Sequence, residues 1–309
     1  MPRLFCFGLG YSARALARRL MEQGWSVAGT SRTAQKCAAL NAEGFDAHLF
    51  SDASPMADPA TALAGTTHVL SSIAPSRDPD AIDPVLSAHG DALAAIEPRL
   101  SWVGYLSTTS VYGDRDGAWT DEQAPLRPTS ERGERRVKAE RVWQGFGRDN
   151  ALPVHCFRLA GIYGPGRSAI DQLRSGTARR IDKQGQVFNR IHVDDIATIL
   201  IASMQRPRAG AVYNCADDEP APSSDVMAFA AQLLGVEPPP LIPFDEADIS
   251  PMARGFYSEN KRTDNWLMKS ELGVSLAYPN YRAGLRAQLS AEQESGGKAA
   301  GAPPSRSGL

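Results

Sequence analysis

The sequence has few of the residues that build metal cages and disulfide frameworks. Its four cysteines are dispersed over 309 residues, and no two have C-x-x-C spacing. We therefore expect neither a disulfide framework nor a cysteine metal site, and we assign no metal to the chain. Cys6, Cys156 and Cys215 lie in apolar, strand-like runs and are expected to be buried thiols.

Long apolar runs and a strong charge of one sign are also missing. No apolar run approaches the roughly 20 residues needed to cross a bilayer, and the N-terminus shows no signal-peptide pattern. The formal net charge is −2, which indicates neither a nucleic-acid partner nor an acidic tail. We therefore expect a cytoplasmic protein that acts on a small molecule and binds neither nucleic acid nor membrane.

Strand-like and helix-like segments alternate over residues 1–160. Six apolar runs read as strands, and a helix is expected over residues 82–99 before the fifth of them; the runs are "RLFCFGLG", "WSVAGTS", "FDAHLF", "THVLSSIA", "WVGYLST" and "LPVHCFRLA". Repeated strand–helix units imply a parallel sheet with helices on both faces. Because the crossovers between such strands are right-handed, the predicted fold class is α/β, a doubly wound (Rossmann) sheet.

The pattern loosens after residue 160. Residues 161–290 are predicted to form a smaller, substrate-binding lobe that is partly interleaved with the sheet of residues 1–160. Residues 291–309 include "ESGGKAAGAPPSRSGL", which contains only small and polar residues apart from its terminal leucine. We expect this tail to be disordered.

A glycine-rich turn joins the first strand to the first helix. It reads G-x-G-x-x-A, from Gly8 through Gly10 to Ala13. The first glycine permits the tight turn, the second lets backbone approach a pyrophosphate, and the alanine allows close helix–strand packing. The helix N-terminus then offers free N–H groups to phosphates. The cofactor residues expected in this turn are Gly8, Leu9, Gly10, Tyr11 and Ser12.

The end of the second strand, "GTSR", has no acidic residue. An acidic residue there would hold the ribose 2′-hydroxyl of NAD. Ser31 and Arg32 can instead accommodate a 2′-phosphate, although Arg32 can equally be a solvated residue at a helix start. We therefore predict NADP as cofactor, with NAD as the alternative.

Several segments occur in one order over residues 3–289: "GLGYSA", "LSTTSVYGD", "RLAGIYGPGRS", "NRIHVDDIA", "YNCADDEP" and "NKRTDNWLMKSELG". Together they resemble the NAD(P)-dependent sugar-nucleotide epimerase/dehydratase family, the extended short-chain dehydrogenases. The resemblance implies a Rossmann lobe, a C-terminal lobe that closes over the substrate, and a homodimer.

The resemblance also implies roles for individual residues. In "STTSVYG", Thr108 matches the family's catalytic Ser/Thr, which hydrogen-bonds the substrate oxygen. The alternative is that this hydroxyl only bonds backbone at the strand end. Residues 160–163 match the loop beside the nicotinamide carboxamide. We accordingly assign Ile73, Ala74 and Ile162 to the cofactor and Thr109 to the substrate.

In "NRIHVDDIA", Asp194 and Asp195 are expected to cap the following helix, because acidic residues suit a helix N-terminus. Arg190 and His192, on the preceding strand, are assigned to an anionic substrate. For His192 a purely structural role is an equal alternative.

The family's Tyr-x-x-x-Lys pair has no match in "SERGERRVKAER" (residues 130–141). Gly133 and Glu140 anchor the alignment, which places Arg132 at the tyrosine position and Arg136 at the lysine position. Lys138 falls two residues away from that position and is expected on a solvated, ion-paired face.

Helical spacing gives the same orientation without the family. An apolar stripe of Ala139, Val142, Trp143 and Phe146 should face the sheet, and its continuation carries Arg132 and Arg136 inward. Arginine cannot exchange protons near neutral pH, but it can hold an anion or stabilise an oxyanion. Four tyrosines are open as substitutes for the missing pair: Tyr105, Tyr112, Tyr163 and Tyr257.

The predicted function is an NAD(P)-dependent oxidoreductase or epimerase that transfers hydride on a small anionic or nucleotide-linked substrate. Its predicted catalytic residues are Thr108, Arg132 and Arg136. Two alternatives stay open: a non-catalytic NAD(P)-binding redox sensor, and a scaffold that no longer binds the cofactor.

Overall fold

The computed structural model describes residues 1–51, 53–78, 81–96 and 99–300. Its centre is a seven-stranded parallel sheet in the order β11-β7-β5-β4-β1-β2-β3. The strands are β1 (Arg3–Phe7), β2 (Ser26–Ser31), β3 (Asp46–Leu49), β4 (His68–Ser71), β5 (Trp102–Thr108), β7 (Val154–Leu159) and β11 (Val212–Cys215). The reversal of strand order between β1 and β4 confirms the predicted doubly wound fold. The seventh strand, β11, comes from the second part of the chain and pairs with β7, Val212 opposite Cys156.

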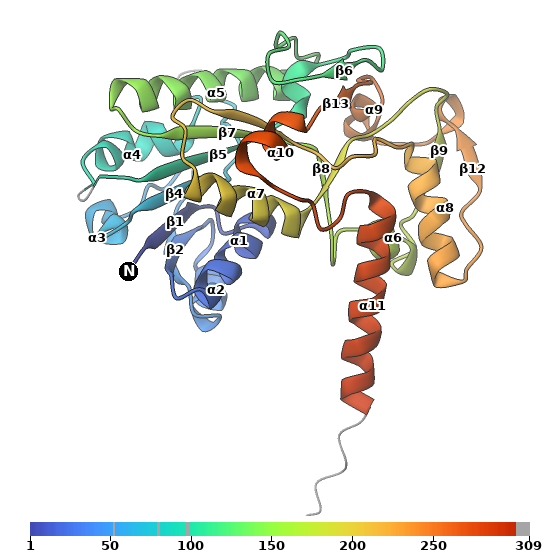
Figure 1. Cartoon of the computed structure of the whole chain (residues 1–309), viewed down its shortest axis with the longest axis horizontal. Coiled ribbons are helices and arrows are strands. Elements are labelled where there is room, and N and C mark those ends of the chain that lie inside the picture. Colours follow the sequence, from blue (N-terminus) through green and yellow to red (C-terminus); the bar gives the residue numbers. More distant parts are fainter. Residues whose placement is uncertain (52, 79–80, 97–98, 301–309) are drawn as a thin grey trace, which may run out of the picture.

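Helices cover both faces of this sheet (Figure 1). One hydrophobic cluster packs the sheet against α1 (Tyr11–Glu22), α2 (Ala34–Ala42), α7 (Val193–Gln205) and α10 (Trp266–Leu272). A second cluster packs the other face against α3 (Pro59–Leu63), α4 (Pro84–Ala94) and α5 (Glu131–Asp149). The helix predicted over 82–99 begins later, at Pro84, because the Asp83 side chain caps α4 by accepting from the Val85 and Leu86 N–H groups. It also ends earlier, at Ala94, and residues 97–98 of the prediction lie outside the described residues.

A smaller lobe stands beside the carboxyl end of the sheet (Figure 1). It contains α6 (Ala169–Arg174), α8 (Ser223–Leu234), α9 (Pro251–Phe256) and α11 (Tyr281–Ala300), with short turns η1 (Thr109–Tyr112) and η2 (Phe244–Glu246) nearby. Three two-stranded parallel pairs complete it: β8 (Gly161–Tyr163) with β10 (Arg190–His192), β9 (Arg180–Asp182) with β12 (Leu241–Pro243), and β6 (Trp119–Thr120) with β13 (Arg262–Thr263).

Three further expectations concern the tail, the cysteines and the membrane. Helix α11 runs to Ala300, so residues 291–300 of the predicted disordered tail are helical, and residues 301–309 lie outside the described residues. All four cysteines are buried free thiols, as predicted for Cys6, Cys156 and Cys215. No helix within the described ranges is both long and apolar enough to span a bilayer. The same ranges contain no cluster of His, Cys, Asp and Glu suited to a metal ion.

Candidate active site

The glycine-rich turn leaves the start of α1 open. Gly8 has φ +87°, and a Cβ there would lie 2.9 Å from the Ser72 Oγ, so both the conformation and the space favour glycine. Gly10 is the N-cap of α1, has no side-chain cap, and a Cβ on it would meet no atom within 4 Å. The first N–H groups of α1 are therefore free to meet an anion.

A cavity of about 980 Å³ begins at this turn. Its wall includes Gly10, Tyr11, Ser12 and Ile162 of the predicted cofactor residues, together with residues that follow β4, β5 and β7 and much of the smaller lobe. The remaining predicted cofactor residues lie outside the described cavity wall. Gly8 and Leu9 lie in the glycine-rich turn, and Ile73 and Ala74 follow β4. Ser31 is buried at the end of β2, and Arg32 beside it is exposed.

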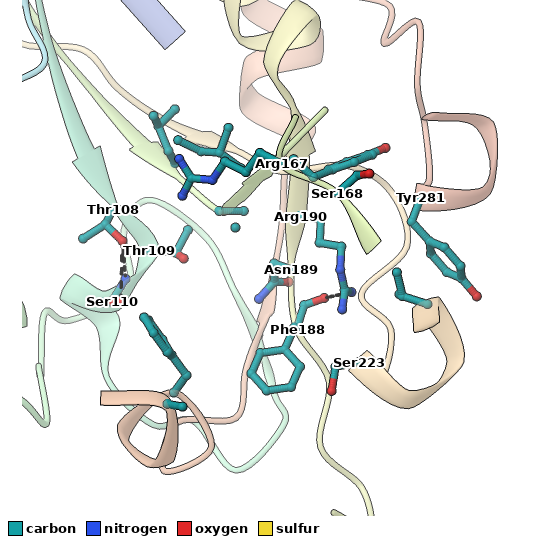
Figure 2. Close-up of a pocket in the computed structure, with 18 of the residues that line it drawn as sticks. Thr108, Thr109, Ser110, Arg167, Ser168, Phe188, Asn189, Arg190, Ser223 and Tyr281 are labelled. Carbon is teal, nitrogen blue, oxygen red and sulfur yellow. Dashed lines mark hydrogen bonds between the residues drawn. The ribbon is translucent and has the colours of Figure 1, made fainter. Parts of the chain in front are cut away.

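Thr108 ends β5 and lines the cavity with Thr109 and Ser110 (Figure 2). Its Oγ1 accepts from the Ser110 N–H at 3.3 Å and donates to the Ser110 Oγ at 3.5 Å. Both contacts are long, so the hydroxyl caps η1 and also remains available to a ligand in the cavity.

Arg136 is buried against β5 as well as lining the cavity. Its Nη1 donates to the Tyr105 hydroxyl at 3.0 Å and to the Leu106 carbonyl at 2.8 Å. Its guanidinium also lies 5.6 Å from the centre of the Tyr105 ring. The side chain points inward, as the helical spacing predicts, but one of its nitrogens is held by the sheet.

Arg132, one turn earlier on α5, is exposed, although helical spacing predicts an inward position like that of Arg136. It lines the cavity, and the described part of the chain offers its guanidinium no hydrogen bond or ion pair. Partial burial lowers the Arg132 pKa from its ordinary value, and the nearby charges of Arg136, Arg135 and Arg167 lower it further. The electrostatic cost of this cluster would be relieved by a bound anion.

Arg167 is a residue that the sequence reasoning missed. It lines the cavity, and its guanidinium lies 5.9 Å from the Tyr11 ring centre, next to the start of α1. Figure 2 shows it on the side of the cavity that holds Thr108 and Thr109. The only signal in the sequence is its place directly after the "YGPG" turn.

The charges on the cavity wall are strongly unbalanced. Of the described residues that line it, six are basic and one is acidic, and that acid, Glu259, pairs with the Lys261 Nζ at 2.6 Å. The six basic residues are Arg132, Arg136, Arg167, Arg179, Arg190 and Lys261. Such a site favours an anionic ligand.

Arg190, predicted to contact an anionic substrate, lines the cavity, but His192 does not. Arg190 is half-buried, and its Nη1 donates to the Phe188 and Ala221 carbonyls, each at 2.9 Å. The His192 Nδ1 accepts from the Asp194 N–H at 3.2 Å and caps α7, while its ring packs 3.9 Å from that of Tyr278. The substrate contact assigned to His192 is therefore corrected to a structural one.

The expected capping by the two aspartates also needs correction. The cap of α7 is the His192 ring, and Asp195 instead accepts from the Ala277 N–H at 2.8 Å and the Tyr278 N–H at 3.0 Å. Asp194 lies in the first turn of α7, where its charge suits the helix dipole.

None of the four candidate tyrosines stands free in the cavity. Tyr105 and Tyr112 are fully buried outside its described wall, and burial raises the Tyr112 pKa to about 12. Tyr163 and Tyr257 do line it, but their hydroxyls bond the Asn280 carbonyl at 3.2 Å and the Ser223 Oγ at 2.8 Å.

Two surface expectations on α5 have different outcomes. Lys138 is exposed, as predicted, and Arg135 pairs with Glu131 at 3.4 Å on the same helix. The expected apolar stripe is wrong at Val142, which is 41% exposed. Of its other members, Ala139 and Trp143 are fully buried and Phe146 is partly buried.

Residues 8–216 match the NAD dependent epimerase/dehydratase family. The chain belongs to this family. A conserved protein of unknown function from Silicibacter pomeroyi DSS is 52% identical, with a TM-score of 0.84 over 94% of this chain and 99% of that one. Protein YeeZ of Escherichia coli K12 is 28% identical over 244 residues, which are 77% of this chain and 86% of YeeZ.

Family members with named activities are more distant. Human dTDP-D-glucose 4,6-dehydratase is 26% identical over 138 residues, 42% of this chain and 39% of the enzyme. The dTDP-glucose 4,6-dehydratase of Bacillus anthracis, solved in complex with NAD, has a TM-score of 0.73 at 15% identity over 95% of this chain and 97% of that one. At that identity the likeness shows the fold alone.

Proposed function

We propose that this family member is a nicotinamide-dinucleotide-dependent oxidoreductase or epimerase that acts on an anionic substrate. One observation carries the proposal: a single cavity joins the uncapped start of α1, the Thr108 hydroxyl and six basic side chains. A pyrophosphate, a reacting oxygen and a substrate anion would each find a suitable partner there.

The residues present fit a dinucleotide. The backbone at Gly10 is open, the first turn of α1 contains no acidic residue, and small Ala13 is fully buried where α1 packs on the sheet. These features supply N–H donors and a positive dipole end to a pyrophosphate. When bound, the nicotinamide would supply or accept the hydride.

The rest of the chemistry would fall to this chain's own side chains. The Thr108 hydroxyl would hydrogen-bond the substrate oxygen, and Arg132 and Arg167 would bind the substrate anion or stabilise negative charge that develops on that oxygen. Arg136 would contribute through its charge and by fixing the end of β5 beside Thr108.

The preference for NADP rests on the end of β2. Arg32 is exposed there, and the described residues give its guanidinium no hydrogen-bond or ion-pair partner. An unpaired guanidinium suits a 2′-phosphate, whereas no carboxylate follows β2 to bind a 2′-hydroxyl.

The test is a two-step experiment with purified protein. NADPH and NADH are first titrated by calorimetry, and NADPH oxidation is then followed with a panel of anionic carbonyl compounds. We expect saturable NADPH binding and turnover that falls at least tenfold in Thr108→Ala, with NADPH affinity unchanged. Binding without any turnover across the panel would favour the second candidate.

That second candidate is a dinucleotide-binding redox sensor. One observation favours it: of the four tyrosines on the described cavity wall, Tyr11, Tyr163 and Tyr257 each bond a protein oxygen through the hydroxyl, and burial raises the pKa of the fourth, Tyr281, above its ordinary value. A sensor would bind NADPH and NADP⁺ and change a property such as its oligomeric state between the two.

A further inference from the structure

We infer that Tyr11 is a positioning residue: its backbone belongs to the cofactor turn, and its side chain holds Arg167 in place to bind the substrate anion. The inference rests on the proposed function and deepens it, because it gives Arg167 a partner that orients it. Its basis is that Tyr11 takes part in two features of the site at once, although it lies far from Arg167 in the sequence.

The backbone of Tyr11 lies where a pyrophosphate is proposed to bind. Tyr11 is the first residue of α1 and directly follows Gly10, the N-cap that has no side-chain cap. The first N–H groups of a helix have no acceptor within the helix, and the Tyr11 N–H is one of them. A substitution of the Tyr11 side chain leaves this N–H in place.

The Tyr11 side chain contacts the turn that precedes α6. Its hydroxyl donates to the Pro165 carbonyl at 3.0 Å. Its ring centre lies 5.9 Å from the Arg167 Cζ, within the range of a cation–π contact. Partial burial raises the Tyr11 pKa to about 12, so the hydroxyl keeps its proton at neutral pH and remains a donor.

The turn over residues 164–167 is built to admit the Tyr11 hydroxyl. The Arg167 N–H donates to the Gly164 carbonyl at 2.9 Å and closes the turn. Gly164 has φ +148°, and a Cβ there would lie 2.7 Å from the Tyr11 hydroxyl oxygen and 2.9 Å from the Val193 Cγ1. Only glycine therefore allows the turn to lie this close to the starts of α1 and α7.

The chain is also fixed on the other side of Arg167. Ser168 is the buried N-cap of α6 and forms a capping box with Asp171. The Ser168 Oγ accepts from the Asp171 N–H at 3.3 Å, and the Asp171 carboxylate accepts from the Ser168 N–H at 2.8 Å. The backbone of Arg167 is thus held from both sides, which leaves its side chain as the part that the Tyr11 ring orients.

The Arg167 side chain has little else to orient it. Its guanidinium lines the cavity without a hydrogen bond or ion pair to any residue that the structure describes. Figure 2 shows it on the side of Thr108, so an anion bound there would lie near the proposed reacting oxygen. An arginine loses rotamer freedom when it binds an anion, and a ring that already restricts it reduces this loss. Removing the ring should therefore weaken anion binding although every anion contact is kept.

Calorimetry with inorganic phosphate on the full-length protein saturated with NADP⁺ tests the inference. Tyr11→Phe keeps the ring and loses the hydroxyl, and should weaken phosphate binding about twofold to threefold. Tyr11→Leu loses both contacts and should weaken it about fivefold or more. The matched control is Tyr213→Phe, which removes a hydroxyl that bonds Glu271 at 2.8 Å outside the described cavity wall and should leave phosphate binding unchanged.

A double-mutant cycle separates positioning from a general structural role. Arg167→Gln removes the guanidinium, so adding Tyr11→Leu to it should weaken phosphate binding by less than about twofold more. An equal loss from Tyr11→Leu in the wild type and in Arg167→Gln would overturn the inference, because Tyr11 would then act without Arg167.

The inference would also be overturned by unchanged phosphate affinity in Tyr11→Leu, or by a wild type that binds no phosphate. A greater loss of NADP⁺ affinity than of phosphate affinity in both Tyr11→Leu and Arg167→Gln would overturn it too, because Arg167 would then hold the cofactor. Failure of the proposed function is distinct from these results, since it would appear first as a wild type that binds no NADP⁺ in the same calorimeter.

Discussion

The Arg136 guanidinium is joined to the Tyr105 hydroxyl by a hydrogen bond of 3.0 Å, deep between α5 and β5. Arg132, one helical turn away, has no such partner among the described residues. Two arginines one turn apart on the same helix therefore have different tasks. Arg136 holds the sheet, whereas Arg132 lines the cavity where we propose that an anion binds.

The first prediction separates these two tasks. Arg136→Met leaves the buried Tyr105 hydroxyl and Leu106 carbonyl without their donor, and should cost about 1–3 kcal/mol of unfolding free energy. Arg132→Met should change stability by less than about 0.5 kcal/mol but weaken anion binding severalfold. Urea unfolding and anion calorimetry on both variants check this, and equal stability losses would contradict it.

A second prediction concerns the buried pair of Glu140 and Arg158. Both side chains are at most 5% exposed and meet at 2.8 Å, and Ser107 also donates to Glu140. Glu140→Gln leaves a buried guanidinium without its counter-charge and should cost about 3–5 kcal/mol in urea unfolding. The control is Glu131→Gln on the exposed face, expected to change stability by about 0.5 kcal/mol or less.

The third prediction is a pH dependence of stability. Burial raises the pKa of Asp217 to about 8, and its Oδ2 has no partner within the described residues. Unfolded, this carboxyl has a pKa near ~3.9, so between about pH 4 and pH 8 the unfolded chain binds fewer protons than the folded one. Stability should therefore fall as the pH rises through this window.

Asp217→Asn isolates that effect, because asparagine does not titrate. Other groups titrate in both proteins, so the relevant quantity is the difference in melting temperature between the variant and the wild type. This difference should grow in favour of Asp217→Asn from pH 4 to about pH 8 and then level off. A constant difference over that range would show that Asp217 is ionised in the folded protein.

The fourth prediction concerns cofactor choice. If Arg32 meets the 2′-phosphate, Arg32→Ala should raise the Kd for NADPH about tenfold or more and leave that for NADH unchanged. Lys36→Ala, on the same exposed segment at the start of α2, is the control. A similar loss for both nucleotides would mean that Arg32 acts only on the local fold.

The parts of this molecule that depend on local sequence could be predicted. Strand–helix alternation and the Gly8–Gly10 turn predict the sheet, and helical spacing orients Arg136 inward, whereas Arg132, nearer the start of the helix, is exposed at the cavity. Contacts between distant segments could not be read in this way. Arg167 meets Tyr11 only after the chain has crossed the sheet. His192 caps α7, while Asp195 bonds the distant Ala277 and Tyr278 N–H groups.

The most direct measurement is NADPH oxidation by the wild type and Arg167→Gln with a panel of anionic carbonyl compounds, at NADPH concentrations that calorimetry shows to be saturating. The account predicts turnover by the wild type with at least one anion, and a loss of about tenfold or more in kcat/KM for Arg167→Gln. Saturable NADPH binding with no oxidation of NADPH by any compound would contradict it.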